Sequence, residues 1–594
     1  MKTFIKKYFK NLIWFYSYLG PKLFSLVFFS VMLGLLDGIG LTMFLPILQM
    51  SNGELDFSSE SSQKLYFLFR WLSNNGIQLS FFTPLFLMVL FFILKGFAKF
   101  FSEIYRVNLQ QTLLKKIRLD TLKLLNNYRY KSYITSDKGQ IQNTLTGELD
   151  KIQQIFVYYF RVLENVILVL LYMGLAFLID IKFALVVTIA GALTNTFFSV
   201  IFKKTKSTSH KLTSSNNYLQ NQIIQQISNF KYLRATGSLN KYFIKLKRTI
   251  ENIEKSRGRI GILNGFQVAS REPTMVIIIT LVIIIQIKIL EGDLGPIIIS
   301  LLFFYRALSS LNALQNSWNV FLSLSGSIEN LKSLIKELSK EQEIFSTKIF
   351  SGFKSHIKLV NVYFSYNKKL ILKNINLTIK KNSSIAIIGE SGGGKTTMVN
   401  IIVGLLNIDR GSLLLDGTDL REYDIRTFQK KIGYITQESV IFNDSLYNNV
   451  TLWDEKNDKN MSRFLNAISF ASLTEIIESY PQKEETNLGL DGINLSGGQK
   501  QRISIARELY KDIEILIFDE ATSSLDTDTE IQIQKSIDSL KGELTIFTIA
   551  HRLSTIKKSD EIIILKDGNI IDKGHYLDLI KNNHDFKRLI DLQS

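Results

Sequence analysis

The chain has 594 residues, too many for one hydrophobic core, and this length predicts about two to four domains. It contains 71 lysine and arginine residues against 53 acidic ones, a net charge of +18 that suits either nucleic acid or an anionic membrane surface. The absence of cysteine excludes disulfide bonds, cysteine zinc sites and thiol chemistry.

The beginning of the chain mixes lysines with aromatic side chains from Lys2 to Tyr16. A cleavable signal peptide needs a short apolar core followed by small residues, and this segment has neither. We therefore expect an interfacial helix that lies on the inner leaflet of a membrane.

Six apolar segments follow, each long enough to cross a hydrocarbon core of about 30 Å. They lie at about 23–49, 81–104, 155–179, 182–203, 262–290 and 294–324. The loops differ in charge: residues 105–154 carry nine basic and four acidic side chains, residues 203–260 carry thirteen and two, and residues 50–80 hold only two basic ones. This positive-inside pattern predicts that both termini are cytoplasmic and argues against nucleic acid as a partner.

The two basic loops look helical and polar, so spans two to five should continue well beyond the bilayer. Residues 325–349 look like a charged, helical connector. Beyond it, short apolar strands alternate with polar helices, as in a soluble α/β domain. We predict a transmembrane domain over 1–330, a linker over 331–353 and an ATP-binding domain over 354–594.

The most specific motif reads Gly-Glu-Ser-Gly-Gly-Gly-Lys-Thr at residues 389–396, a match to G-x-x-x-x-G-K-[ST]. Glycines let the backbone N–H groups approach a triphosphate closely, while Lys395 adds a mobile charge and Thr396 a hydroxyl for Mg²⁺. The apolar run 384–388 before the motif and the run 398–406 after it fit a strand, a loop and a helix. The motif predicts an ATP site.

A second motif, a pair of acidic residues, follows the apolar run Ile515–Phe518. Asp519 ends a buried strand, where its carboxylate can hold the Mg²⁺ shell. Glu520 comes one residue later and can orient or deprotonate the attacking water.

These motifs, together with Gln437, Leu-Ser-Gly-Gly-Gln at 495–499 and His551, occur in an order that resembles the nucleotide-binding domain of ABC transporters. The resemblance covers residues 354–594. With the six spans, it implies a membrane α-helical domain, its six transmembrane helices extended into the cytoplasm, followed by an α/β P-loop ATPase domain with a helical subdomain.

The resemblance implies ATP and Mg²⁺ as cofactors and assigns roles to individual residues. Tyr366 would stack on adenine, Gln437 would contact Mg²⁺ and the membrane half, and His551 would contact the γ-phosphate. Thr396, Gln437 and Asp519 would hold the metal, and Glu520, His551 and Gln437 would serve catalysis. The nucleotide would be bound by Tyr366, Gly389, Glu390, Ser391, Gly392, Gly393, Gly394, Lys395, Thr396, Thr397, Ser496, Gly497, Gly498, Gln499 and Asp526.

The segment 495–499 opens a helix, and free N–H groups at a helix start suit phosphate. The family places this helix end across the nucleotide on a partner subunit. Because one chain carries every motif intact, two copies would form two equivalent sites, which favours a homodimer. Leu490 departs from the pattern, since exporters often carry a glutamate there.

Charged residues inside the spans bear on the cargo, because a charge in a membrane is costly and usually faces a cavity or a partner. Arg161 and Glu164 are one helical turn apart and are expected to neutralise each other. Arg271 and Arg306 lie in spans five and six, which line the cavity in this family. In a dimer they would offer four guanidinium groups suited to phosphate.

A helix expected at 64–73 in the first external loop, Tyr305-Arg306 in span six and the segment 494–502 resemble bacterial lipid-linked oligosaccharide flippases. This resemblance implies a multi-pass protein of the bacterial cytoplasmic membrane that exports an amphipathic, lipid-linked anion by alternating access. Multidrug or peptide export is the alternative. Soluble motors and separate importer ATPases share the ATP-binding domain, but the six fused spans argue against both.

Overall fold

The computed structural model describes residues 10–44, 47, 81–179, 181–288, 294–367, 369–390, 392–519, 535, 537–549, 556–583 and 586–587. The fold divides into two units. The helical unit comprises Met1–Tyr128 and Thr135–Gln342, and the α/β unit comprises Arg129–Ile134 and Glu343–Ser594. The external helix expected at 64–73 lies outside the described residues.

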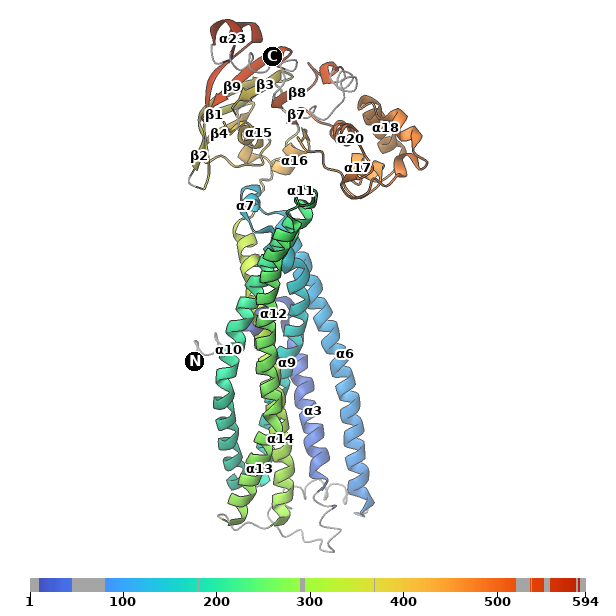
Figure 1. The fold of residues 1–594 in the computed structure, drawn as a ribbon. Helices are drawn as coiled ribbons and strands as arrows, with labels where there is room; N and C mark the ends of the chain where they lie inside the picture. The colour runs from blue at the N-terminus through green and yellow to red at the C-terminus, as the bar shows by residue number, and fades with distance from the viewer. Residues whose placement is uncertain are drawn as a thin grey trace. The chain divides into compact units, whose positions relative to one another are not determined.

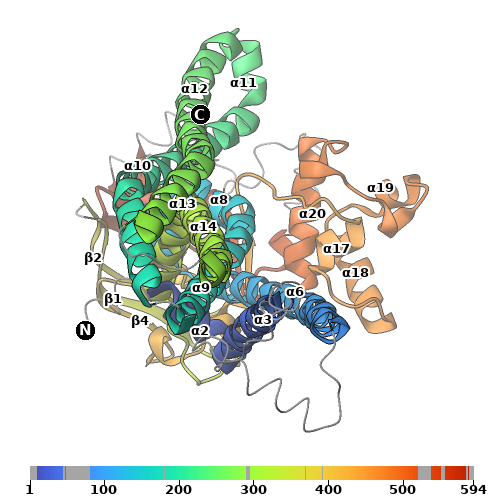
Figure 2. The same ribbon diagram turned by 90° about the horizontal axis from the view of Figure 1, so that it is seen from below.

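Long helices make up the helical unit, and they run side by side (Figure 1). They are α2 (Lys10–Leu19), α3 (Phe24–Thr42), α6 (Phe82–Asn126), α9 (Leu149–Ile179), α10 (Ile181–Ser228), α12 (Leu239–Ala269), α13 (Arg271–Lys288) and α14 (Leu294–Lys340). Shorter elements are η1 (Gly20–Leu23), α8 (Lys138–Asn143), η2 (Thr144–Glu148) and α11 (Phe230–Ala235). Figure 2 shows α10 and α12 on one side of the bundle and α3 and α6 on the other.

Several helices are long enough to cross a bilayer and continue past it. At 1.5 Å per residue, the 45 residues of α6 extend about 67 Å, against about 30 Å of hydrocarbon. Among the described residues, three helical stretches meet the length and composition of a membrane span: Lys10–Thr42, Phe82–Asn126 and Lys138–Phe177.

Aromatic packing holds the helical unit together where α2, α9 and α14 meet. Phe15 and Phe156 are fully buried, with ring centroids 5.4 Å apart in an edge-on arrangement. Tyr159 packs at 5.6 Å from Phe321 of α14. Such pairs add to the large apolar area that aromatic side chains bury, so the amphipathic first helix is tied to the bundle.

Helix α14 continues through the predicted domain boundary at residue 330. Ile328, Leu331, Leu334 and Leu338 are buried and recur at helical spacing. Residues 331–340, the first part of the predicted linker, therefore continue the helix.

One short helix that lies far in sequence from the rest of the α/β unit belongs to that unit, except for its last residue. This is α7 (Tyr130–Thr135), which follows α6. The Lys131 ammonium group lies 3.2 Å from the Asp409 carboxylate and 4.7 Å from the centre of the Phe364 ring. Both contacts fix the helix on the unit that carries the P-loop.

Two sheets form the centre of the α/β unit. The six-stranded sheet has the order β10-β9-β3-β8-β7-β6, and the four-stranded sheet has the order β2-β1-β4-β5. The first contains β3 (Ser384–Gly389), β6 (Ile432–Ile435), β7 (Ile515–Asp519), β8 (Thr545–Ile549), β9 (Glu561–Lys566) and β10 (Asn569–Gly574). The second contains β1 (His356–Tyr366), β2 (Lys369–Lys380), β4 (Arg410–Leu415) and β5 (Thr418–Asp419).

The strands β9, β3, β8, β7 and β6 pair in parallel. Their continuous apolar sequences fit this arrangement, because a parallel sheet is covered on both faces. Besides α7, the helices in the described part of this unit are α15 (Lys395–Ile402), α16 (Ile425–Gln429), α17 (Leu446–Thr451), α18 (Asp458–Phe470), α19 (Thr474–Ser479), α20 (Gly497–Tyr510) and α23 (Tyr576–Asn582), with the short η3 (Leu420–Glu422), η4 (Lys483–Glu485) and η5 (Leu490–Gly492). Helices α17, α18 and α20 form a separate lobe beside the sheets (Figure 1).

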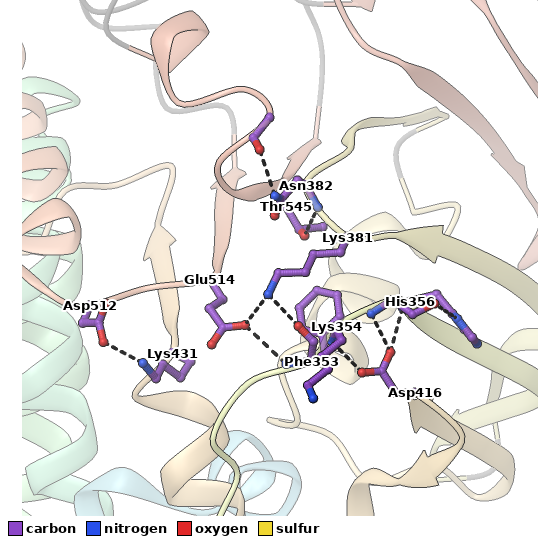
Figure 3. Close-up of polar contacts among 12 residues, drawn as sticks. Phe353, Lys354, His356, Lys381, Asn382, Asp416, Lys431, Asp512, Glu514 and Thr545 are labelled. Carbon is purple, nitrogen blue, oxygen red and sulfur yellow. Dashed lines mark hydrogen bonds and ion pairs between the residues drawn. The ribbon is translucent and has the colours of Figure 1, made fainter.

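A group of polar contacts fastens the segment before β1 to the sheets (Figure 3). The Asp416 carboxylate accepts hydrogen bonds from the backbone N–H groups of Lys354, Ser355 and His356. The Lys381 ammonium group donates to the Phe353 carbonyl at 2.6 Å and lies 3.4 Å from the Glu514 carboxylate. These contacts hold the segment before β1 in place against the sheets of the α/β unit.

Candidate functional site

The P-loop connects the end of β3 to the start of α15, which is the strand, loop and helix context expected from the sequence. Gly389 has φ 150° and Gly394 has φ 101°. A Cβ on Gly389 would collide with the Leu565 carbonyl oxygen, and one on Gly394 would come within 2.8 Å of the Leu372 side chain. The loop therefore keeps a backbone path that side chains would block, as a phosphate cradle requires.

Lys395 lies inside this cradle and is buried. Its ammonium group donates to the carbonyl oxygens of Gly389 at 2.9 Å and Glu390 at 3.1 Å. The positive charge of Lys395 therefore lies against the P-loop itself, beside the space that the loop surrounds. Ser391 lies outside the described residues.

The residues predicted to hold a metal gather at one edge of the six-stranded sheet. Asp519 ends β7, Gln437 follows the end of β6, and Thr396 lies in the first turn of α15, directly after β3. Because these strands are parallel, their carboxyl ends meet at the same edge. A hydroxyl, an amide oxygen and a carboxylate are hard oxygen donors, which is the donor set that fits Mg²⁺.

Tyr366 lies beside the P-loop helix. Its hydroxyl makes a hydrogen bond with the Thr397 side chain, and its ring meets Phe364 edge-on at 4.9 Å. Burial raises the pKa of Tyr366 above its ordinary value. This location agrees with a role at the nucleotide base, which stays a prediction.

Tyr434 lies at the same site, although no motif in the sequence marks it. Its hydroxyl makes a hydrogen bond with the Asp519 carboxylate from the neighbouring strand. Burial first, and then the charge of Asp519, raise the pKa of Tyr434. The parallel pairing of these two apolar strands was the signal that could have revealed the contact.

The signature segment begins α20. Ser496 caps the helix: its hydroxyl accepts from the Gln499 N–H at 3.2 Å, and the Gln499 side chain accepts from the Ser496 N–H at 2.8 Å. This capping box leaves Ser496 and Gly497 exposed at the surface. Before it, Leu490 and Ile493 are 71% and 79% exposed.

The structure thus brings together the P-loop, Thr396, Thr397, Tyr366, Gln437 and Asp519 within the α/β unit. It leaves the capping Ser496 and Gln499, with Gly497 and Gly498, on the start of a different helix. The remaining predicted residues, Glu520, Asp526 and His551, lie outside the described residues.

Charged side chains also meet inside the helical unit. Asp37 of α3 is 1% exposed; it accepts from the Lys95 ammonium group of α6 at 2.5 Å and from the Tyr172 hydroxyl of α9. Arg306 of α14 is partly buried and lies near Tyr172. For Arg271 the structure describes only the backbone, at the start of α13.

The expected pairing of Arg161 with Glu164 is wrong. Glu164 pairs instead with two residues of α6: its carboxylate lies 2.7 Å from the Lys99 ammonium group and 3.7 Å from the Arg106 guanidinium group. Arg161 lies over the Tyr158 ring at 5.5 Å. A neighbouring helix supplies better-placed cations than the same helix does, and spacing along one segment cannot show this.

Comparison with known proteins agrees with the geometry in both units. The model of the ABC transporter transmembrane region matches residues 23–310, and the model described as ABC transporter matches residues 372–523. The structure of a bacterial Atm1-family ABC exporter with ATP bound has a TM-score of 0.76 over 97% of this chain and 99% of that chain, at 21% identity. This likeness shows the exporter fold.

Three relatives illustrate the range of named functions. The heterocyst differentiation ATP-binding protein HepA of Nostoc sp. is 30% identical over 491 residues, 81% of this chain and 79% of that protein. The ATP-dependent lipid A-core flippase of Desulfotalea psychrophila is 28% identical over 526 residues, 86% and 89% of the two chains. YgaD of Bacillus subtilis, named for multidrug export, is 38% identical over 240 residues, 40% and 41% of the two chains. This chain therefore belongs to the ABC transporters, with a membrane domain and an ATP-binding domain fused in one polypeptide.

Proposed function

We propose that this protein is an ATP-driven exporter of an amphipathic lipid anion, with a lipid-linked oligosaccharide as the favoured cargo. The observation that carries the cargo class is the group formed by Asp37, Lys95, Tyr172 and Arg306 inside the helical unit. Its two cations exceed its one carboxylate, so the group has a surplus positive charge that an anionic headgroup can neutralise. The flippase named among the relatives supports the same class.

The nucleotide site would work with Mg²⁺ held by Thr396, Gln437 and Asp519. When bound, the cation would neutralise charge on the transferred phosphoryl group. Lys395 would contact the outer phosphates, Glu520 would orient the attacking water, and His551 would contact the γ-phosphate.

We further propose that the active form is a homodimer with two composite sites. Support comes from Ser496 and Gly497, which are exposed at the start of α20. A second copy would bring this helix start to the nucleotide, where its N–H groups suit phosphate. Such a dimer would lie in the bacterial cytoplasmic membrane with both termini inside, as the basic loops predict.

Multidrug or peptide export is the second candidate. The relative YgaD, named for multidrug export, favours it. For a cationic drug, the surplus charge at Lys95 and Arg306 would be unfavourable, because like charges repel strongly at low dielectric constant.

Stimulation of the ATPase tests the cargo class. Purified protein in nanodiscs would be offered polyprenyl-pyrophosphate-linked glycans, phospholipids and cationic drugs in parallel. We expect stimulation by the pyrophosphate-linked lipids, and a loss of that stimulation with intact basal turnover when Arg271 and Arg306 are both replaced by Gln. Arg→Lys replacements should restore part of it, because an ammonium group keeps the charge but not the bidentate fork. Stimulation by cationic drugs alone, equal in all variants, would favour the second candidate.

A further inference from the structure

Tyr434 contacts three parts of the α/β unit: strand β7, helix α20 and the main apolar core. It belongs to β6, and its register partner on the parallel strand β7 is Ile517, two residues before Asp519. From this position its hydroxyl reaches the Asp519 carboxylate and makes a hydrogen bond. The ring packs against the main core of the unit.

The backbone of Tyr434 is fixed independently of that hydroxyl. Its N–H donates to the Glu508 carboxylate of α20 at 3.1 Å, and Glu508 is buried and also receives the Lys511 ammonium group at 2.6 Å. The preceding Gly433 lets the strand lie close to α20, since a Cβ there would come within 3.2 Å of the Glu508 side chain. The helix that the signature segment opens therefore holds the strand that carries Tyr434.

The short helix α7 lies near the same residue. Tyr130, its first residue, is close to both Tyr434 and Tyr366. Tyr434 is thus hydrogen-bonded to the signature helix and to the last residue of β7, and it lies near α7.

We propose that Tyr434 is a positioning residue that orients the Asp519 carboxylate for Mg²⁺. This inference rests on the proposed function, in which Asp519 holds the metal. A carboxylate has two oxygens. When one accepts from the tyrosine hydroxyl, rotation of the carboxylate is restricted and the other oxygen stays available for a metal ion bound with Thr396 and Gln437. Ligating carboxylates are commonly held in this way, and loss of the supporting group typically costs about 10- to 100-fold in metal affinity.

Tyr434→Phe isolates the hydroxyl, because it keeps the ring and its packing. In the full-length protein in nanodiscs, Mn²⁺ binding would be measured by electron paramagnetic resonance with a non-hydrolysable ATP analogue. ATP binding in EDTA would be measured separately. We expect Mn²⁺ affinity to fall about tenfold or more, with ATP affinity in EDTA within about twofold of wild type.

Tyr423→Phe is the matched control, because Tyr423 is also partly buried against the same core. It should leave Mn²⁺ affinity unchanged. In an Asp519→Asn background, Tyr434→Phe should have little further effect, since the carboxylate that it positions is gone.

Two outcomes would overturn the inference. One is an Mn²⁺ affinity of Tyr434→Phe within about twofold of wild type. The other is an equal loss of ATP binding in EDTA, which would make Tyr434 a packing residue. A wild-type protein that binds neither Mn²⁺ nor nucleotide would instead contradict the proposed function itself.

Discussion

The Lys395 ammonium group lies against two carbonyl oxygens of its own loop, and Asp519 is held by a tyrosine from the next strand. Both charges that would meet a metal-bound triphosphate are therefore oriented by the surrounding protein. Charged groups that are positioned before the reaction need no reorganisation during it, which is the main source of catalysis in phosphoryl transfer.

Replacing Glu520 by Gln should separate binding from turnover. The variant keeps Asp519 but lacks the carboxylate that would activate water, so ATP binding should persist while steady-state hydrolysis falls by about 100-fold or more. Hydrolysis measured within about threefold of wild type would show that Glu520 is not that group.

The ion pair between the buried Asp37 and the partly exposed Lys95 gives a prediction about stability. Lys95→Met removes the ion-pair partner of a carboxylate that is 1% exposed. Because the Lys95 side chain is itself 31% exposed, the loss should be smaller than the about 3–5 kcal/mol that breaking a fully buried ion pair costs. The double variant Asp37→Asn/Lys95→Met should be clearly more stable than Lys95→Met alone. Thermal unfolding in detergent would check this order, with the more exposed Lys99→Met as the control. Equal melting temperatures for the single and double variants would contradict it.

At the scale of elements, the sequence predicted the parts that local chemistry determines. The apolar run Ile515–Phe518 forms β7, and the glycines after Ile388 form the loop between β3 and α15. Other features depend on distant neighbours. The π-helical turn at Thr144–Glu148 accommodates Glu148, which is fully buried and bonds to Asn143 and Lys151. The pairing of Glu164 with α6, like the contact of Tyr434 with Asp519, required the packing partner to be known.

The contacts of Asp416 give a prediction with a pH dependence. Burial opposes ionisation, but hydrogen bonds from three backbone N–H groups outweigh it and lower the pKa of Asp416. Its stabilisation is therefore present above the unfolded pKa of about 3.9 and is lost as the pH falls through the lower folded value.

Asp416→Asn should lower the stability of the full chain by about 1 kcal/mol at pH 7. The difference in stability between the variant and the wild type should become smaller below about pH 4. Thermal unfolding at pH 7 and below pH 4 would measure it, with Asp567→Asn as the control. A difference that does not depend on pH would mean that the carboxylate charge is not responsible.

For the whole molecule, the central question is whether one chain can complete a site. If Ser496 contacts the nucleotide that is bound to the partner subunit, a mixed dimer of one Ser496→Arg chain and one Lys395→Ala chain has one composite site that contains neither substitution. We expect such verified heterodimers to recover part of the ATPase, whereas each variant alone stays inactive. No recovery would favour either self-contained sites or two sites that must act together.

ATP-driven movement of a pyrophosphate-linked lipid across the membrane of proteoliposomes, measured beside efflux of a cationic dye, tests the proposed transport directly. We predict that wild-type protein moves the lipid, that Glu520→Gln does not, and that the dye is not transported. Dye efflux without lipid movement, or lipid movement that is the same in Glu520→Gln, would contradict the account.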